Sequence, residues 1–295
     1  MHQSFINHRG YRYATVSIVA VFISALAYLL DRPRVPASGG TWLGYTLGTI
    51  AALLVLFLSL FGIRKRAFYS RIGTAVGWLS AHVYLGLAAI IVATLHTGLQ
   101  FGANIHTLGY VLMWVVTLSG CWGMYAYLRY PALMSRHRGN RRHKELLAEI
   151  SSLDELSREM ATTSGRILAL VDDSIRRTDL GSNRFWRQLR GKDRSCLLLT
   201  GESALRPARL LPNPGNRLLI EKLAELHVAT PDDHTRKTIQ RLLEHAGQKA
   251  VLLNRLRAET RLAAMLRLWL VIHVPACCAL LAALCAHVTI VFLYW

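Results

Sequence analysis

Four histidines occur as two pairs with the same spacing. His82 and His96 are 14 residues apart in one apolar stretch, and His273 and His287 are 14 residues apart in another. In an α-helix, 14 residues turn the chain through about 1,400°, about 40° short of four full turns, and rise about 21 Å. Both members of a pair therefore lie on one helix face, at two separate levels. Imidazole is a common ligand for transition metals, so the pattern indicates two metal-binding levels.

Five apolar stretches are long enough to cross the ~30 Å hydrocarbon core of a membrane, which needs roughly 17–25 helical residues. They cover residues 13–30, 42–62, 74–98, 106–128 and 267–295. The first is flanked like a signal peptide, but its apolar core of about 18 residues exceeds the usual ~7–15, so we expect a retained anchor. The fold class predicted is an all-α membrane protein with five transmembrane helices.

The net charge of +18 is unevenly distributed. Sixteen of the 17 acidic residues and 25 of the 35 Lys and Arg residues lie between Arg136 and Arg261. This segregation excludes a uniform soluble globule, a disordered chain and a secreted disulfide scaffold. Cations also flank the N-terminus, the loop after the second span and the end of the fourth, whereas the alternate loops are poorer in them. By the positive-inside rule we expect a bacterial inner-membrane protein with a cytoplasmic N-terminus and insert and a periplasmic C-terminus.

In this topology the third and fifth spans run in the same direction. His82 is then level with His273 on the inner side, and His96 is level with His287 on the outer side. Two imidazoles on facing helices can take both axial positions of a heme iron, so the sequence predicts two stacked b-type hemes. The alternative is a set of histidines that hydrogen-bond across a bundle or line a proton path. One zinc or copper ion shared by all four is excluded, because about 21 Å separates the levels.

The H-x13-H pattern on two transmembrane helices resembles the di-heme b-type membrane cytochromes, including the cytochrome b subunit of quinol–cytochrome c reductases and ferric-reductase-like transmembrane domains. The resemblance covers residues 42–129 and 266–295 and implies a di-heme four-helix bundle. By it, the axial ligands are His82, His96, His273 and His287. Two features depart from the family: a fourth span and a long insert separate the ligand helices, and no quinol-site motif is recognisable.

A fifth histidine, His106, begins the fourth span near the outer level. We expect it to contact the outer heme or a quinone, to replace an outer ligand, or simply to cap its helix. Small residues in the spans would admit a flat ligand or would allow helices to pack closely. They are Gly44, Gly48, Gly77, Gly86, Gly109, Ser119, Gly120, Gly123, Ala276, Ala279, Ala283 and Ala286.

The other polar candidates are weaker. Cations that could pair with heme propionates are Arg71 and Arg267 on the inner side and Arg32 and Arg34 on the outer side. The five cysteines form neither a C-x-x-C-H motif for covalent heme attachment nor a four-cysteine set for an iron–sulfur cluster. Seven histidines lie in polar segments, where we expect solvated side chains: His2, His8, His137, His143, His227, His234 and His245.

The insert, residues 131–266, is predicted to be a basic helical domain. Leu, Ile and Met recur at helical spacing over residues 141–176, and a turn-rich middle follows. Thr230-Pro231-Asp232-Asp233 has the composition of a helix start, with a hydroxyl N-cap, proline at N1 and acids in the first turn. We expect this last helix to run into the fifth span. The charge of about +9 suits an acidic partner or anionic lipid headgroups.

Two hemes stacked across a bilayer would carry electrons, and bis-histidine iron has no open position for oxygen chemistry. The sequence contains no flavin- or nicotinamide-binding motif. We therefore expect the electron-transfer subunit of an oxidoreductase complex, working between the quinone pool and a partner subunit with iron–sulfur, flavin or multiheme centres. The alternatives are a stand-alone transmembrane reductase of ferric or ascorbate type, and a non-redox transporter or sensor. Nucleic-acid binding has no motif in its favour.

Overall fold

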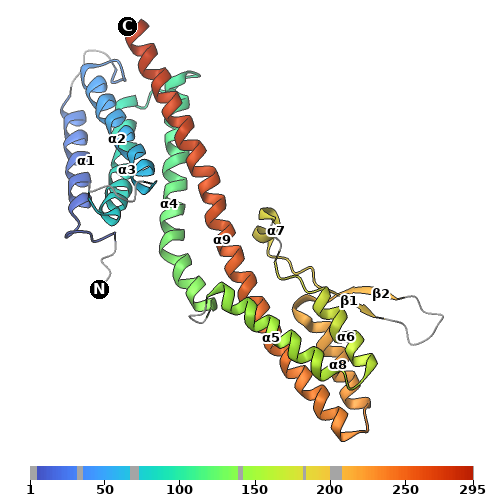
Figure 1. Cartoon of the computed structure of the whole chain (residues 1–295). Helices are drawn as coiled ribbons and strands as arrows, with labels where there is room; N and C mark the ends of the chain where they lie inside the picture. The colour runs from blue at the N-terminus through green and yellow to red at the C-terminus, as the bar shows by residue number, and fades with distance from the viewer. Residues whose placement is uncertain are drawn as a thin grey trace. The chain divides into compact units, whose positions relative to one another are not determined.

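The computed structural model describes residues 5–31, 36–66, 73–138, 142–181, 184–199 and 208–294. Most of this chain is helical (Figure 1). It forms two compact units, one of Met1–Ala126 with Trp269–Trp295 and one of Tyr127–Leu268. Two long helices, α4 (Ile105–Arg138) and α9 (Asp233–Tyr294), pass from one unit into the other.

Five of the described helices are long and apolar enough to cross a membrane, which confirms the number expected from hydropathy. They are α1 (Arg12–Leu30), α2 (Trp42–Arg66), α3 (Ala75–Thr97), α4 and α9. Large apolar side chains stay exposed along them, Phe22, Leu29 and Phe292 among them. Exposed apolar side chains of this kind suit helices that could lie among lipid tails.

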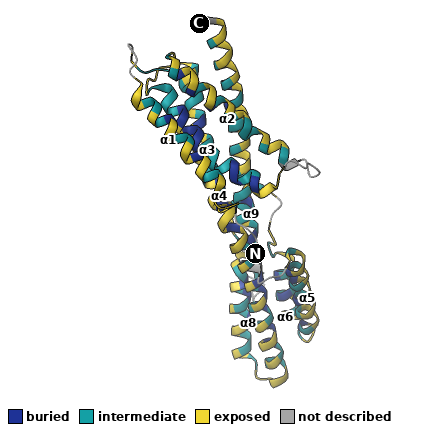
Figure 2. Cartoon of the chain, turned by 90° about the vertical axis from the view of Figure 1, so that its left-hand side faces the viewer, coloured by how far each residue is buried: buried dark blue, intermediate teal, exposed yellow. Residues whose placement is uncertain are grey.

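The first unit is built around α3, which packs against both α1 and α2. Its buried face is made largely of small residues, including Ser80, Ala81, Ala88 and Ala89, which let neighbouring backbones approach (Figure 2). The Thr74 hydroxyl caps the start of α3 by accepting from the Gly77 amide at 3.1 Å. Gly98, at φ +57°, ends it. Between these two ends α3 carries His82 and His96.

The long helices differ in detail from the expected bounds. α4 continues through Pro131 to Arg138, about ten residues beyond the apolar stretch. α9 is one helix that enters the fifth span, as the sequence predicts, but its cap is Asp232 and not Thr230. The Asp232 carboxylate accepts from the Thr235 amide at 2.8 Å. The Thr230 hydroxyl instead donates to a carbonyl of the preceding helix.

The second unit contains more than helices, so the all-α prediction is wrong in this part. Its helices are α5 (His143–Ala161), α6 (Gly165–Arg176), α7 (Phe185–Arg190), the short η1 (Pro214–Asn216) and α8 (Arg217–Ala229). Strands β1 (Cys196–Leu199) and β2 (Arg209–Pro212) pair antiparallel, with Cys196 opposite Pro212. Runs of four residues between turn-rich segments are too short to sustain a helix, and pairing satisfies their backbone instead.

Two apolar clusters hold this unit together. The first joins α5 to α9 through Leu146, Ile150 and Leu253. The second gathers side chains from α6, β1, α8 and α9. An ion pair also links α5 to α9, with Lys249 Nζ 2.6 Å from a carboxylate oxygen of Asp154. Burial lowers the pKa of Lys249, and the Asp154 carboxylate offsets part of that effect.

Candidate functional site

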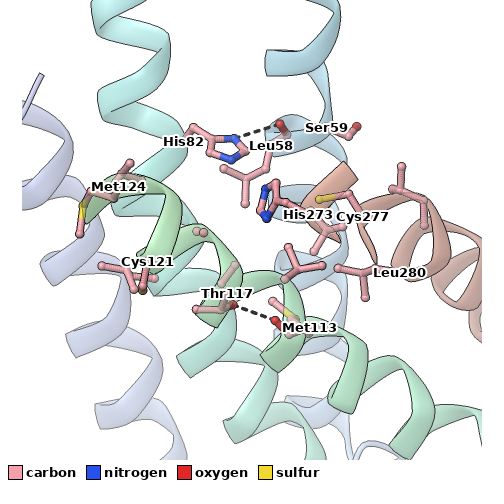
Figure 3. Close-up of a pocket in the computed structure, with 18 residues that line it drawn as sticks. Leu58, Ser59, His82, Met113, Thr117, Cys121, Met124, His273, Cys277 and Leu280 are labelled. Carbon is pink, nitrogen blue, oxygen red and sulfur yellow. Dashed lines mark hydrogen bonds between the residues drawn. The ribbon is translucent and has the colours of Figure 1, made fainter. Parts of the chain in front are cut away.

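His82 of α3 and His273 of α9 line one cavity in the first unit. Residues of α2, α3, α4 and α9 form its walls, and it holds about 820 Å³ of empty space, its open mouth included. Figure 3 shows the two imidazoles facing one another across it. Most of the remaining lining is apolar, including Val55, Met113 and Leu280. The cavity thus places two histidines among mostly apolar side chains.

Each ring has a hydrogen-bond partner at Nδ1. His82 Nδ1 lies 3.2 Å from the carbonyl oxygen of Leu58, which can only accept, so Nδ1 is the protonated nitrogen. His273 Nδ1 lies 2.8 Å from the Ser119 hydroxyl. If that hydroxyl donates its single proton to the Val116 carbonyl at 2.9 Å, it accepts from His273. In these neutral tautomers both rings keep a free lone pair on Nε2, the nitrogen available to a metal.

His96 has the same arrangement at the other end of α3. Its Nδ1 lies 2.7 Å from the carbonyl oxygen of Gly44, so this nitrogen also donates to a backbone carbonyl of α2. The ring rests on Gly48, where a β-carbon would come within 2.6 Å of Cε1. From the sequence, the Gly44–Gly48 spacing could serve either helix packing or space for a ligand. In the structure these two glycines position His96: the Gly44 carbonyl accepts its hydrogen bond, and Gly48 leaves space for its ring.

His287 lies next to both His96 and His106. The ring centroids of His96 and His287 are 6.1 Å apart at an interplanar angle of 76°. Two imidazoles that bind one iron through ~2 Å bonds have centroids about 6 Å apart, so this separation has the right size. His106 Nδ1 lies 2.5 Å from His287 Nδ1. If His287 donates this bond, its Nε2 is free, like those of the other three histidines.

The predicted small residues take up different positions. Gly86 and Gly120 line the cavity, and a β-carbon at position 120 would be 3.6 Å from His273 Cε1. Gly123 makes room for the indole of Trp269, which would lie 2.2 Å from a β-carbon there. Gly77 faces His8, outside the cavity. Gly109 has open space around it.

The expectation that His8 is solvated is wrong. Its residue is only 8% exposed, and its Nε2 would lie 3.0 Å from a β-carbon at Gly77. Tyr84 fastens the same segment by donating to the Ile6 carbonyl at 3.0 Å. No feature of the sequence separates His8 from other flanking histidines, because its burial comes from a turn that folds back on α3.

Sequence reasoning also missed Trp269. It stands one turn before His273 on α9, with ring centroids 5.5 Å apart. Its indole Nε1 is buried and has no hydrogen-bond partner among the described residues. Of the cations considered for propionates, Arg267 is exposed, whereas Arg32, Arg34 and Arg71 lie outside the described residues.

The donor set at each level is a pair of imidazoles. Within the described part of the chain, no group of three or more His, Cys, Asp or Glu side chains is placed to hold a metal ion. Bare zinc or copper needs three or four protein ligands. A heme iron brings four equatorial nitrogens of its own and needs only two imidazoles, so paired histidines with free Nε2 atoms fit it.

No family model, curated protein or solved structure matches the chain.

Proposed function

We propose that this protein is a di-heme b-type cytochrome, the membrane subunit of an oxidoreductase complex that moves electrons between the quinone pool and a partner redox subunit. The observation that carries the proposal is that each of the four histidines has a hydrogen-bond partner at Nδ1. His82 and His96 each donate Nδ1–H to a backbone carbonyl of α2, His273 Nδ1 lies 2.8 Å from the Ser119 hydroxyl, and His287 Nδ1 lies 2.5 Å from His106 Nδ1. Histidines that ligate metals usually have such a partner, because it sets the tautomer and holds the ring.

At the level of the cavity, His82 and His273 would hold one heme. Leu58 and Ser119 orient the two rings, and Gly120 leaves a flat group room beside His273. Trp269 offers its unpartnered N–H one turn away, where a propionate could accept it. The apolar walls limit water around this site. Such burial tunes the potential of a heme, whose chemistry when bound is one-electron transfer.

At the other level, His96 and His287 would hold the second heme. Gly44 and Gly48 position His96, and His106 is the partner of His287. By the proposed topology this level is periplasmic, and the basic insert is cytoplasmic, where it would meet a partner subunit. A chain with two bis-histidine hemes and no flavin-binding motif needs such a partner to exchange electrons.

A second candidate function is a non-redox proton path. The direct contact of His106 with His287, beside His96, is the observation that favours it. Such a path needs the histidines but no prosthetic group, so the two proposals differ in what the purified protein contains.

Heme content tests the proposal directly. The full-length chain, purified in detergent, should contain two hemes per polypeptide by pyridine hemochrome and show the spectrum of low-spin b heme. His287→Ala should remove one heme and His82→Ala the other, whereas His234→Ala, at an exposed position on α9, should retain both. A heme-free protein, or one that keeps both hemes after either change, contradicts the proposal. Co-purified redox subunits would separate a complex from a stand-alone reductase.

A further inference from the structure

The short helix α7 and the residues just after it form an exposed basic surface in the second unit. We call it the α7 patch, and its members are Trp186, Arg187, Arg190, Lys192 and Arg194. All five are exposed, and Trp186 is 65% exposed. A tryptophan side chain is highly buried on average, so its exposure among cations indicates a surface that binds another molecule.

The helix itself is two-sided. Phe185, Gln188 and Leu189 are half-buried, which leaves Trp186, Arg187 and Arg190 on the open face. The Phe185 and Trp186 rings meet edge to face with centroids 5.2 Å apart, so Phe185 packs against the indole. A supported indole beside arginines is the combination that places a surface helix in a membrane interface.

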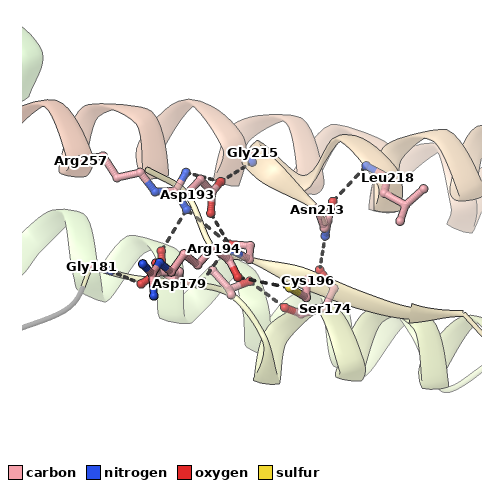
Figure 4. Close-up of polar contacts among 12 residues, drawn as sticks. Ser174, Asp179, Gly181, Asp193, Arg194, Cys196, Asn213, Gly215, Leu218 and Arg257 are labelled. Atoms are coloured by element: carbon pink, nitrogen blue, oxygen red, sulfur yellow. Dashed lines mark hydrogen bonds and ion pairs between the residues drawn. The ribbon is translucent and has the colours of Figure 1, made fainter. Parts of the chain in front are cut away.

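The charge of the patch is not cancelled by its own acid. Asp193 is the sole acidic residue between positions 184 and 194. Its carboxylate lies 2.7 Å from Arg257 Nη1 and accepts from the Gly215 and Ser195 amides (Figure 4). Asp193 is therefore committed to Arg257 and to two backbone amides, and it does not neutralise the charges of Arg187, Arg190, Lys192 and Arg194.

Chain connectivity keeps the patch within reach of lipid. Gly191, at φ +60°, ends α7, and a β-carbon there would lie 3.2 Å from Cδ of Arg261. Eight residues along the chain lead from Arg261 to Trp269, where the part of α9 that belongs to the first unit begins. Eight residues cannot span more than about 28 Å. The patch is thus tethered to a membrane-crossing helix, which raises the effective concentration of lipid around it.

We infer that the α7 patch docks on anionic phospholipid headgroups of the membrane that holds the chain's own helices. The arginines and Lys192 pair with phosphates, and Trp186 enters the interface. The contact holds the second unit on the lipid surface. This inference depends on the apolar helices alone and not on the presence of hemes.

Fluorine NMR of the full chain tests the docking. The protein, labelled with 5-fluorotryptophan, is placed in phosphatidylcholine discs with or without phosphatidylglycerol, and Trp186→Phe identifies the resonance of interest. Nitroxide-labelled lipid should relax the Trp186 resonance strongly in the anionic discs and weakly in the neutral ones or at high salt. Arg187→Gln with Arg190→Gln should weaken docking roughly thirty-fold, as expected for two cations at an anionic surface.

The matched control removes the same charge elsewhere. Arg217 and Arg241 are exposed residues of the same unit outside the patch, and Arg217→Gln with Arg241→Gln should leave the relaxation unchanged. The inference is overturned if only a water-soluble relaxation agent acts on Trp186 in anionic discs, or if both arginine pairs reduce the effect equally. Displacement of the patch from anionic lipid by RNA or by an acidic protein at physiological salt would also count against it.

Discussion

His96 rests on Gly48 so closely that a β-carbon at position 48 would lie 2.6 Å from Cε1 and 2.7 Å from Nδ1 of the imidazole. Real β-carbons do not approach other atoms so closely, so the ring has to move if glycine is replaced. Gly48→Ala should break the His96–Gly44 hydrogen bond and remove the heme proposed for the His96–His287 level. Pyridine hemochrome should then give one heme per chain instead of two.

Gly62→Ala is the matched control for this prediction. Gly62 also lies in α2, and a β-carbon there would have no atom within 4 Å. This change should leave both hemes in place and should not lower stability, because alanine is the better helix former by about 1 kcal/mol. Two hemes in the Gly48→Ala protein would contradict the assignment of His96.

Ser119 should control the affinity of the cavity for heme through His273. Ser119→Ala removes the acceptor of the His273 Nδ1 proton and frees the ring to change tautomer. Loss of such a partner costs roughly 10–100-fold in metal affinity, so heme should transfer faster to apomyoglobin. Thr117→Val is the control, because Thr117 lines the same cavity but donates to the Met113 carbonyl of its own helix. Equal transfer rates in the two variants would mean that Ser119 does not position His273.

The buried pair of Lys249 and Asp154 should be sensitive to the loss of one partner. Asp154→Leu leaves a buried ammonium without its carboxylate, which costs about 3–5 kcal/mol. Asp154→Leu with Lys249→Met removes both charges and should be neutral or stabilising by about 1–4 kcal/mol. Hydrogen exchange of the α5 amides in the full chain measures both effects.

The exposed pair of Lys237 and Asp233 is the control for the buried one. It also joins a lysine to an aspartate, with both side chains about 70% exposed. Removing either partner should change stability by no more than about 1 kcal/mol. If Asp154→Leu were equally mild, the burial of the Lys249–Asp154 pair would not carry the cost assigned to it.

The same pair should make the second unit more stable at alkaline pH. Burial lowers the pKa of Lys249 below the value of about 10.4 expected in the unfolded chain. Between these two values the unfolded state binds more protons, so the free energy of unfolding rises with pH. The penalty for burying the charged lysine is fully present below the folded pKa and disappears above the unfolded one.

This pH dependence is measured as the difference between the natural protein and the variant with Asp154→Leu and Lys249→Met. The free energy of unfolding is obtained from hydrogen exchange of α5, corrected for the intrinsic rate at each pH. It should rise in the natural protein relative to the variant as the pH approaches 10. A difference that stays constant with pH would mean that Lys249 has an ordinary pKa in the folded protein.

Local patterns sufficed to locate the five long helices. A run of apolar residues long enough to span a membrane depends on composition alone, which is why α1, α2 and α3 begin and end within a few residues of the expected bounds, apart from the longer α2 end. The hairpin of β1 and β2 could not be predicted in the same way. Its four-residue strands depend on each other for hydrogen bonds and have no period of their own.

The sequence by itself determined that two pairs of histidines lie 14 residues apart, each pair on one helix face, because helical geometry follows directly from residue spacing. Only the tertiary structure decided what surrounds them: the Leu58 and Gly44 carbonyls, the Ser119 hydroxyl, and the approach of His106 to His287. It also decided that His8 is buried against Gly77. These partners come from other helices or turns, and their distances depend on how side chains interlock, which no local pattern encodes.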